Sequence, residues 1–276
     1  MIFTLSAPSH WCKARMKILV IMGSPRNGNT YHAAERIRET LQEKAPVEWE
    51  YVMLRNLHLE QCRGCGSCFV RGEDVCPIDD DVGSVVAKMQ DADGVIFATP
   101  VYALQVSGLM KVFIDRLSYI LHRPRFFRQK ALILTTAGAV GTSDVLTYLD
   151  QIARVMGFDV AAKVGILAEF LPESRKKENE RKLQAAAEEF LAALRKGSRP
   201  SPGFSDVLLF HGQRATFDEL ADQFPTDHAY WSDQGWLEPG CRYFVDVPVN
   251  PISHAAGTLL EWYQRRQIRK DLRDMV

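Results

Sequence analysis

The chain has 276 residues, of which 46% are hydrophobic and 25% are charged, and its 34 Lys and Arg balance its 34 Asp and Glu. This composition is typical of a globular protein with a large core and excludes disordered and fibrous chains. A formal net charge of zero argues against nucleic acid or an anionic membrane as the main partner, because such surfaces attract an excess of basic residues. A small-molecule substrate is therefore the better expectation.

The sequence also bears on the setting of the protein. No apolar run approaches the roughly 20 residues that a membrane-spanning helix needs, so we expect no membrane association. Residues 1–15 lack the basic start and the apolar stretch of a signal peptide, and we interpret them as an extension before the structured part. Six cysteines are too few for a disulfide scaffold, which favours a reducing cytoplasm.

Between Met16 and Gly197, short apolar runs alternate with longer segments of helical period, the pattern of an α/β protein with a parallel sheet. The runs predict five strands, at 17–22, 47–54, 94–98, 131–136 and 159–167. Apolar residues at helical spacing predict helices around 33–41, 109–120, 146–156 and 183–194. This order indicates a doubly wound sheet, in which ligands bind beyond the carboxyl ends of the strands.

The composition changes after the linker-like segment SRPSPG at 198–203. The remaining residues carry Trp231, Trp236 and Trp262, a short amphipathic piece at 217–224 and a basic helix from about His254. We expect all three tryptophans to be buried against the main domain or a second subunit. The predicted organisation is an N-terminal extension at 1–15, one domain at 16–197 and a C-terminal extension at 198–276.

The loop after the first predicted strand reads Gly23-Ser24-Pro25-Arg26-Asn27-Gly28-Asn29-Thr30 and leads into a helix. A helix N-terminus offers unpaired N–H groups and a positive dipole end to a phosphate. Polar side chains and Arg26 suit the same ligand. The loop lacks the Lys-Ser/Thr pair of triphosphatases and the three-glycine dinucleotide fingerprint, which favours a monophosphate. The alternative is a turn capped by Asn29 or Thr30, with Arg26 in solvent.

Two motifs resemble the flavodoxin-fold FMN reductases: MKILVIMGSPRNGNT from Met16, and Ala98-Thr99-Pro100-Val101-Tyr102 at the third strand. The resemblance covers about residues 16 to 195 and implies a flavodoxin-like α/β fold, a doubly wound five-stranded parallel sheet, with bound FMN. It assigns the FMN phosphate to Ser24, Arg26, Asn27, Gly28, Asn29 and Thr30. It assigns the isoalloxazine ring to Pro100, Val101, Tyr102 and Ala103, and a closing loop to Ala137, Gly138 and Gly141.

The residues of the ring loop agree with that assignment. Pro100 is expected to stop the third strand, after which backbone N–H groups can face the polar rim of a flat ligand. Tyr102 is either stacked on the ring or a buried core tyrosine.

Four cysteines follow the second strand in the pattern C-x2-C-x2-C-x7-C-P, formed by Cys62, Cys65, Cys68 and Cys76 with Pro77. Three thiols at intervals of three residues and a fourth within reach can wrap a cubane cluster, and ferredoxin runs also place a proline after the last ligand. Together with the flavin motifs, the pattern resembles the iron–sulfur flavoproteins. That resemblance implies a [4Fe–4S] cluster on all four cysteines, although the seven-residue spacer is long for the family.

A zinc site and a set of free thiols are the alternatives to a cluster at the four cysteines. Four thiolates suit zinc, but the immediate succession of two x2 spacers crowds three ligands more than paired zinc knuckles do. Free thiols would have a redox or structural role. Cys12 and Cys241 lie far away in sequence and are interpreted as ordinary thiols, His32, His58, His122 and His211 as solvent or core residues, and the acidic run 79–81 as a helix start.

The functional hypothesis is an FMN-dependent oxidoreductase that passes electrons from NADH, NADPH or a ferredoxin-like protein donor to a small acceptor such as a quinone or flavin. The cofactor supplies the chemistry, so no catalytic acid or base is expected among the side chains. The alternatives are an iron–sulfur flavoprotein that carries electrons between protein partners, and a flavin-binding sensor whose tail recognises a protein. The resemblance also implies a homodimer or homotetramer.

Overall fold

The computed structural model describes residues 15–168 and 172–274, so almost all of the N-terminal extension, including Cys12, lies outside the described residues. Five parallel strands are arranged in the order β2-β1-β3-β5-β6, which confirms the predicted doubly wound sheet. Their bounds are β1 Met16–Met22, β2 Val47–Met53, β3 Gly94–Tyr102, β5 Lys130–Ala137 and β6 Asp159–Leu167. A two-residue strand that the sequence analysis did not predict, β4 (Gln105–Val106), folds back antiparallel on the end of β3.

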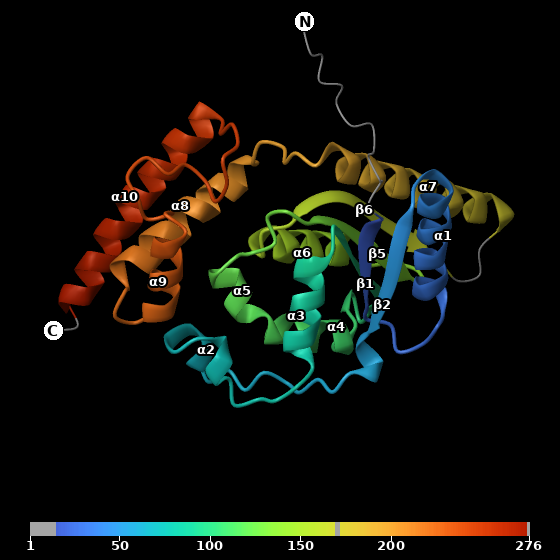
Figure 1. Cartoon of the computed structure of the whole chain (residues 1–276), viewed down its shortest axis with the longest axis horizontal. Helices are drawn as coiled ribbons and strands as arrows, with labels where there is room; N and C mark the ends of the chain where they lie inside the picture. Colours follow the sequence, from blue (N-terminus) through green and yellow to red (C-terminus); the bar gives the residue numbers. More distant parts are fainter. Residues whose placement is uncertain (1–14, 169–171, 275–276) are drawn as a thin grey trace, which may run out of the picture.

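Helices cover both faces of the sheet (Figure 1). One face carries α1 (Asn29–Lys44) and α7 (Glu173–Lys196), and the other carries α3 (Val82–Asp91), α4 (Gly108–Arg116), α5 (Ser118–His122) and α6 (Thr142–Val155). Alternate residues of the central strands enter the two cores: Phe97 of β3 packs on the α4 and α6 side and Ile96 on the α1 and α7 side. Burial on both faces explains why these strands appear in the sequence as continuous apolar runs.

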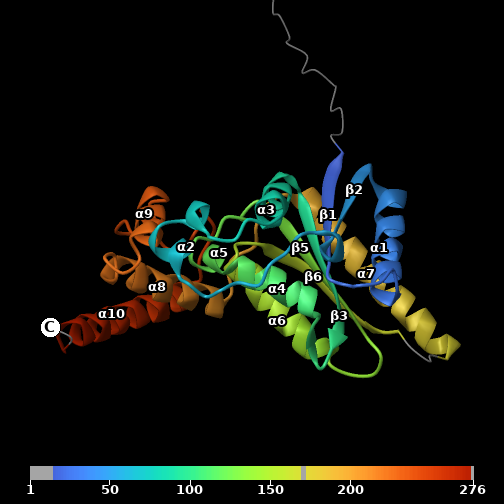
Figure 2. The same ribbon diagram turned by 90° about the horizontal axis from the view of Figure 1, so that it is seen from below.

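The cysteine segment crosses between β2 and α3 with little regular structure. It contains a short 3-10 turn at Leu54–Asn56, the one-turn helix α2 (Ser67–Val70) and a second 3-10 turn at Glu73–Val75. We call residues 60–79 the cysteine loop. Figure 2 shows that this loop runs beside α5 and reaches the C-terminal helices.

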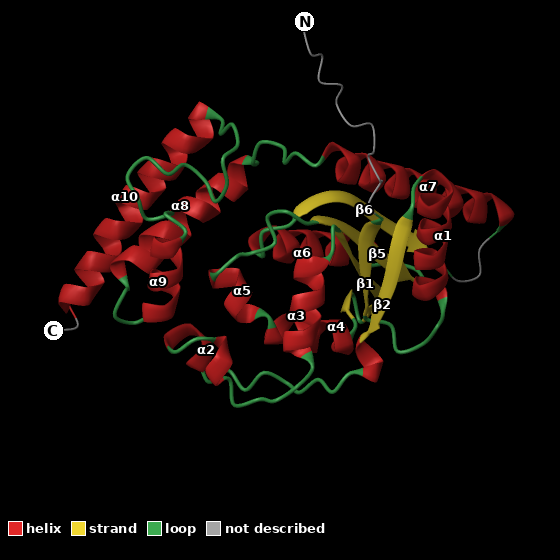
Figure 3. Ribbon diagram, viewed as in Figure 1, coloured by secondary structure: helices red, strands yellow, loops and turns green. Residues whose placement is uncertain are grey.

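The C-terminal extension folds as a helical unit of α8 (Phe204–Glu219), α9 (Pro225–Asp233) and α10 (Pro251–Asp274), which lies beside the sheet (Figure 3). Its core is aromatic and includes Trp231 and Trp236, which are 0% and 3% exposed, as predicted. Trp262 is 57% exposed in the single chain, so the main domain does not bury it, and its burial against a second subunit stays a prediction. Helix α10 packs on α8 through the face that carries Ser253 and Gly257, and at 100° per residue Trp262 lies on the opposite face.

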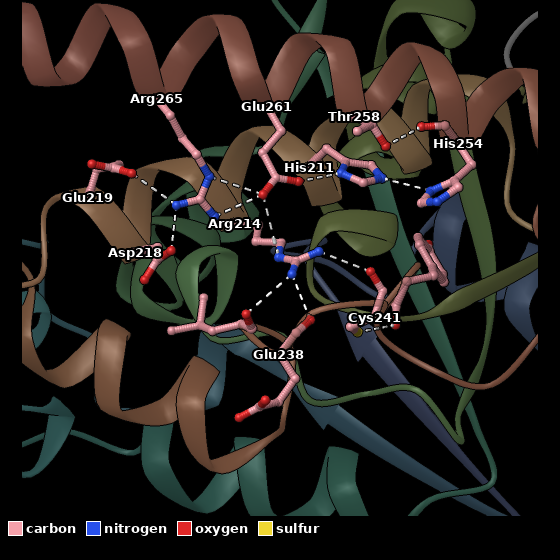
Figure 4. Close-up of polar contacts among 12 residues, drawn as sticks. His211, Arg214, Asp218, Glu219, Glu238, Cys241, His254, Thr258, Glu261 and Arg265 are labelled. Carbon is pink, nitrogen blue, oxygen red and sulfur yellow. Dashed lines mark hydrogen bonds and ion pairs between the residues drawn. The ribbon is translucent and has the colours of Figure 1, made fainter.

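A buried polar network joins α8 to α10 (Figure 4). His211 contacts Glu261 Oε2 through Nδ1 at 2.6 Å and His254 Nδ1 through Nε2 at 3.3 Å. A Cβ on Gly257 would lie 2.2 Å from the His211 ring, so this close approach of the helices requires glycine. His211 is thus a core residue of the interface, one of the two options that the sequence left for it.

The network perturbs two titrating groups. Burial disfavours a charged Glu261, but hydrogen bonds from His211 and Arg265 outweigh burial and hold the pKa of the carboxyl below its ordinary value. Burial, reinforced by the neighbouring His211 and two arginines, lowers the pKa of His254.

Among the described helices, none is both long and apolar enough to cross a bilayer.

Candidate functional site

Three loops meet beyond the carboxyl ends of β1, β3 and β5, where a doubly wound sheet binds its ligands. The Gly23 amide donates to Ala98 O at 2.8 Å, which joins the first loop to the end of β3. Ser107, at the start of α4, donates through Oγ to Gly23 O at 2.6 Å and accepts from the Met110 amide. All three loops were predicted from the sequence, whereas Ser107, which joins two of them, was not.

In the first loop, α1 begins without a side-chain cap. Its N-cap residue is Gly28, no side chain accepts a hydrogen bond there, and its first turn holds no acidic residue. The alternative of a turn capped by Asn29 or Thr30 is therefore wrong. The Thr30 hydroxyl lies instead 2.7 Å from that of Thr136 at the end of β5, and Ser24 Oγ donates to Arg26 O. Arg26, Asn27 and Asn29 are exposed at the mouth of the loop.

A second cation lies at this loop. Arg55, just after β2, donates to Pro25 O at 3.2 Å and to Asn27 Oδ1 at 2.9 Å. The sequence analysis missed Arg55, because it lies 28 residues from Asn27 along the chain and belongs to no motif. The one available signal was the strand order, since the end of β2 adjoins the end of β1.

The second loop differs from its prediction in one respect. Pro100 does not stop β3; the strand continues to Tyr102 and turns at Ala103 and Leu104, which are non-glycine residues with positive φ of 48° and 64°. Such strained backbone persists only where its surroundings fix it, and it is common at ligand sites. Tyr102 is 42% exposed, which excludes the alternative of a core tyrosine.

The third loop packs against the second. Gly141 has a φ of +94°, and a Cβ there would lie 2.8 Å from Val101 Cγ1 and 3.3 Å from Leu104 Cδ2. Both the backbone angle and the contact therefore require glycine. Ala137 is the buried last residue of β5, whereas Gly138 and Val140 are exposed beside the turn.

All four cysteines of the loop line one cavity of about 630 Å³, together with Arg116 and Tyr119. Cys62 and Cys65 are exposed, and Cys68 and Cys76 are half-buried. Across residues 15–168 and 172–274, no three His, Cys, Asp or Glu side chains form a group that could hold a metal ion. The four cysteines thus border the same cavity.

The cavity holds one buried cation against a thiol. Arg116 donates through Nη1 to Cys76 Sγ at 3.3 Å, while Nε and Nη2 donate to the two carboxylate oxygens of Asp80 at 3.0 and 3.1 Å. Both side chains of this pair are nearly inaccessible. Burial alone would raise the pKa of Asp80, but the hydrogen bonds from Arg116 and from two backbone amides lower it.

Asp80 belongs to the acidic run that was interpreted as a helix start. That interpretation is confirmed for Asp81, which is the residue before α3, whereas Asp80 has the further task of holding Arg116.

The thiols differ in their electrostatic surroundings. Hydrogen bonds with Ser67 hold the pKa of the exposed Cys65 thiol below its ordinary value. Burial raises the pKa of the Cys68 thiol, and the positive charge of Arg123 partly opposes this effect. The surroundings of the two thiols thus shift their pKa values in opposite directions.

Comparison with known proteins identifies the family. The model of the NADPH-dependent FMN reductase family matches residues 16–170, which is more than half of the chain. The chain belongs to this family. Membership makes it an FMN-dependent oxidoreductase, with NAD(P)H as the donor that the family uses.

Several relatives of this FMN reductase are iron–sulfur flavoproteins. One, of Archaeoglobus fulgidus, is 27% identical over 226 residues, which cover 80% of this chain and 100% of that protein. Another, of Methanocaldococcus jannaschii, is 39% identical over 102 residues, which cover 37% of this chain and 51% of that protein. One solved structure, the NAD(P)H:quinone oxidoreductase of Methanothermobacter marburgensis, has a TM-score of 0.51 at 20% identity and covers 63% of this chain and 96% of its own. The structural likeness confirms the flavodoxin-like fold.

Proposed function

We propose that this FMN reductase holds FMN in the three loops and a [4Fe–4S] cluster in the cysteine loop, and passes electrons from NAD(P)H or a ferredoxin-like protein to a small acceptor such as a quinone or a flavin. The observation that carries the proposal is the cavity lined by Cys62, Cys65, Cys68 and Cys76, beside a flavin-reductase fold. Bound FMN can take a hydride from NAD(P)H and give up its electrons in pairs or singly.

The first loop fits the FMN phosphate. The uncapped N-terminus of α1 leaves backbone N–H groups for an anion, and the exposed Asn29 adds an amide donor. We assign the buried hydroxyls of Ser24 and Thr30 to the wall of the same seat. Arg26 supplies positive charge at the mouth of the loop, and Arg55 orients its backbone. We assign Asn27 and Gly28 to the same seat.

The second and third loops fit the flavin ring. Pro100 has no backbone N–H, so residues 101–103 supply the backbone N–H groups at the end of β3, and the exposed side chains of Tyr102, Leu104 and Val140 form an apolar border. Ala137, Gly138 and Gly141 bring the third loop against this border. In this arrangement the side chains bind the ring and restrict water, and the protein supplies position rather than an acid or a base.

The cysteine loop fits a cluster better than a zinc ion. Zinc sites usually take their sulfurs from paired C-x2-C knuckles, whereas three of these thiols follow one another at intervals of three residues and all four line one cavity. A cubane offers four separate iron corners to four thiolates and can exchange single electrons. The buried Arg116 at Cys76 is the kind of donor that stabilises a ligating thiolate, which supports Cys76 as the fourth ligand in spite of the long spacer.

The decisive experiment is anaerobic purification followed by absorption spectroscopy, metal and sulfide analysis, and chromatography of the released flavin. We expect FMN together with about four irons and four sulfides per chain, the content of one cubane. Recovery of FAD, or of no flavin after reconstitution, would contradict the flavin assignment. Stoichiometric zinc, or no metal after anaerobic reconstitution, would contradict the cluster and leave a flavin reductase with other thiol chemistry.

A second candidate function is electron transfer between protein partners. It is favoured by the exposure of Cys62 and Cys65, which would leave one side of a cluster within reach of another protein. Steady NAD(P)H oxidation with a quinone or free flavin supports the reductase, and flavin that is reduced only by a protein donor supports the carrier.

We also propose that the protein forms a homodimer or homotetramer. Helix α10 exposes Ile252, Leu259, Trp262 and Tyr263, and an apolar surface of this kind usually marks an interface. Measurement of the mass in solution tests this; a monomer at micromolar concentration would contradict it.

A further inference from the structure

We propose that Arg123 and Asp227 are positioning residues of the cysteine site, through which the C-terminal helical unit fixes the segment between the third and fourth cysteines. This inference rests on the proposed function of the cysteine loop. It makes the C-terminal unit a part of the redox site rather than an appendage to it.

Arg123, directly after α5, is the centre of the arrangement. Its side chain is buried, and its Nη2 donates to Cys68 O at 2.8 Å and to Glu73 Oε2 at 2.9 Å. A single guanidinium nitrogen thus contacts the third cysteine and the middle of the seven-residue spacer. Arg125 donates to the other oxygen of Glu73 at 3.0 Å, so both carboxylate oxygens of that residue are held.

Asp227 of α9 orients Arg123. It is 0% exposed, and one of its oxygens accepts a hydrogen bond from Arg123 Nη1. The other oxygen lies 2.7 Å from His122 Nδ1. Since Asp227 comes from the C-terminal unit and Glu73 from the cysteine loop, Arg123 is the charge that connects them, and without Asp227 it would be a buried cation with only Glu73 and the Cys68 carbonyl as partners.

Further contacts point to the same segment. The His122 ring stacks on Phe69, next to Cys68, with ring centroids 4.2 Å apart. Thr226, beside Asp227, donates to Val70 O at 2.9 Å. Trp231 of α9 also holds His122, the residue on which Phe69 stacks, because its Nε1 donates to His122 O at 2.8 Å.

These contacts address the least typical feature of the cysteine pattern. The spacer of residues 69–75 is long and includes Gly72 at a φ of +97°, so its backbone is otherwise free to move Cys76 away from the other three thiols. Arg123, His122 and Thr226 contact residues between 68 and 73, so a smaller part of the spacer is without contacts from these three residues. Cys62 and Cys65 lie before this segment and serve as an internal reference.

The test uses the reduced, metal-free full-length protein and measures the alkylation rate of each cysteine by mass spectrometry. Asp227→Asn is expected to speed alkylation of Cys68 about tenfold, because loss of the carboxylate charge opens the segment locally, and to change Cys65 less than about twofold. Asp233→Asn, an equivalent change at an exposed position of the same helix, is the control and should leave both rates as in the wild type.

Arg123→Lys separates positioning from folding. Lysine keeps a positive partner for Asp227 but lacks the planar fork that reaches Cys68 O and Glu73 together. We expect near-wild-type tryptophan fluorescence from the buried Trp231, with faster alkylation of Cys68. If Asp227→Asn does not fold, the Cys68 alkylation rate of Arg123→Lys alone tests whether Arg123 positions the cysteine segment.

A second readout follows reconstitution with iron and sulfide. Asp227→Asn and Arg123→Lys should retain FMN and lose roughly half of the iron or more, because local opening of the segment would leave one of the four ligand cysteines unfixed. Unchanged Cys68 alkylation in a folded Arg123→Lys variant would overturn the inference. A wild-type protein that binds no iron would contradict the proposed cluster. It would leave the role of Arg123 and Asp227 open to test, because the alkylation rates are measured on metal-free protein.

Discussion

Arg116 donates a hydrogen bond to the Sγ of Cys76 over 3.3 Å, and Asp80 holds the same guanidinium by two further hydrogen bonds. A buried cation fixed in this way favours a negatively charged sulfur at Cys76. The relationship distinguishes Cys76 from an incidental thiol, since a structural cysteine has no need of a guanidinium that a carboxylate keeps in place.

The first prediction concerns this contact. Arg116→Gln should lower the reduction potential of the proposed cluster and reduce iron content, because the reduced state, which carries more negative charge, would lose a hydrogen-bond donor at one ligand. A redox titration monitored by electron paramagnetic resonance measures the potential. Lys111→Gln, on the exposed face of the same helix, is the matched control. Equal potentials in the wild type and Arg116→Gln would contradict the prediction.

The second prediction concerns the phosphate seat. Arg26→Ala should weaken FMN binding ~10- to 100-fold, the range for loss of a hydrogen bond to a charged group. Flavin fluorescence titration of the apoprotein measures the dissociation constant, and repetition with riboflavin, which lacks the phosphate, is the control. An unchanged affinity for FMN would mean that Arg26 contacts solvent alone.

The third prediction tests the packing of the ring loops. Gly141→Ala should destabilise the protein by ~1–3 kcal/mol and weaken FMN binding, because the new methyl group meets Val101 at a backbone angle that alanine avoids. Gly83→Ala, at the start of α3 with no atom near its would-be Cβ, should be neutral or slightly stabilising. Thermal unfolding with and without FMN separates the two effects. Equal melting temperatures for the two variants would contradict the assigned contact.

The fourth prediction is a loss of stability in acid. The folded pKa of His254 lies below its ordinary 6.5, so the neutral ring contributes stability above that pH, which is lost as the pH falls through the folded pKa. The lowered pKa of Glu261 adds a second loss below its ordinary 4.5. The melting temperature should therefore fall between about pH 7.5 and about pH 5.5, and by less in His254→Gln. An equal fall in both proteins would show that His254 contributes nothing.

The main domain could be predicted from sequence because its signals are local. The central strands β1, β3 and β5 are largely buried on both faces and form apolar runs. The helical stripes of α1, α4, α6 and α7 lie where periodicity placed them. The candidate phosphate loop could be located because it immediately follows a strand. The two-residue strand β4 was missed, since its hairpin contains Ala103 and Leu104 in place of the glycine or asparagine that predicts a turn.

The contacts that complete the candidate site could not be predicted, because they join distant parts of the chain. Arg116 is 40 residues from Cys76, and Arg123 is 104 from Asp227. Neither arginine belongs to a motif: Arg116 lies within the predicted helical stretch at 109–120, and Arg123 follows it. The exposure of the Trp262 side chain could not be predicted either. Aromatic content indicates that a segment packs against another element, but not which face of its last helix does so.

The contact between Arg123 and Asp227 also sets an order of events in the cell. A ribosome adds ~5–20 residues per second, and the 159 positions from Cys68 to Asp227 therefore take on the order of 10–30 s to translate. During that interval the flavin fold can form while the third and fourth cysteines are not yet secured. With the proposed cluster, iron–sulfur insertion would thereby be coupled to completion of the polypeptide, and a truncated translation product would mature as a flavoprotein without stable iron.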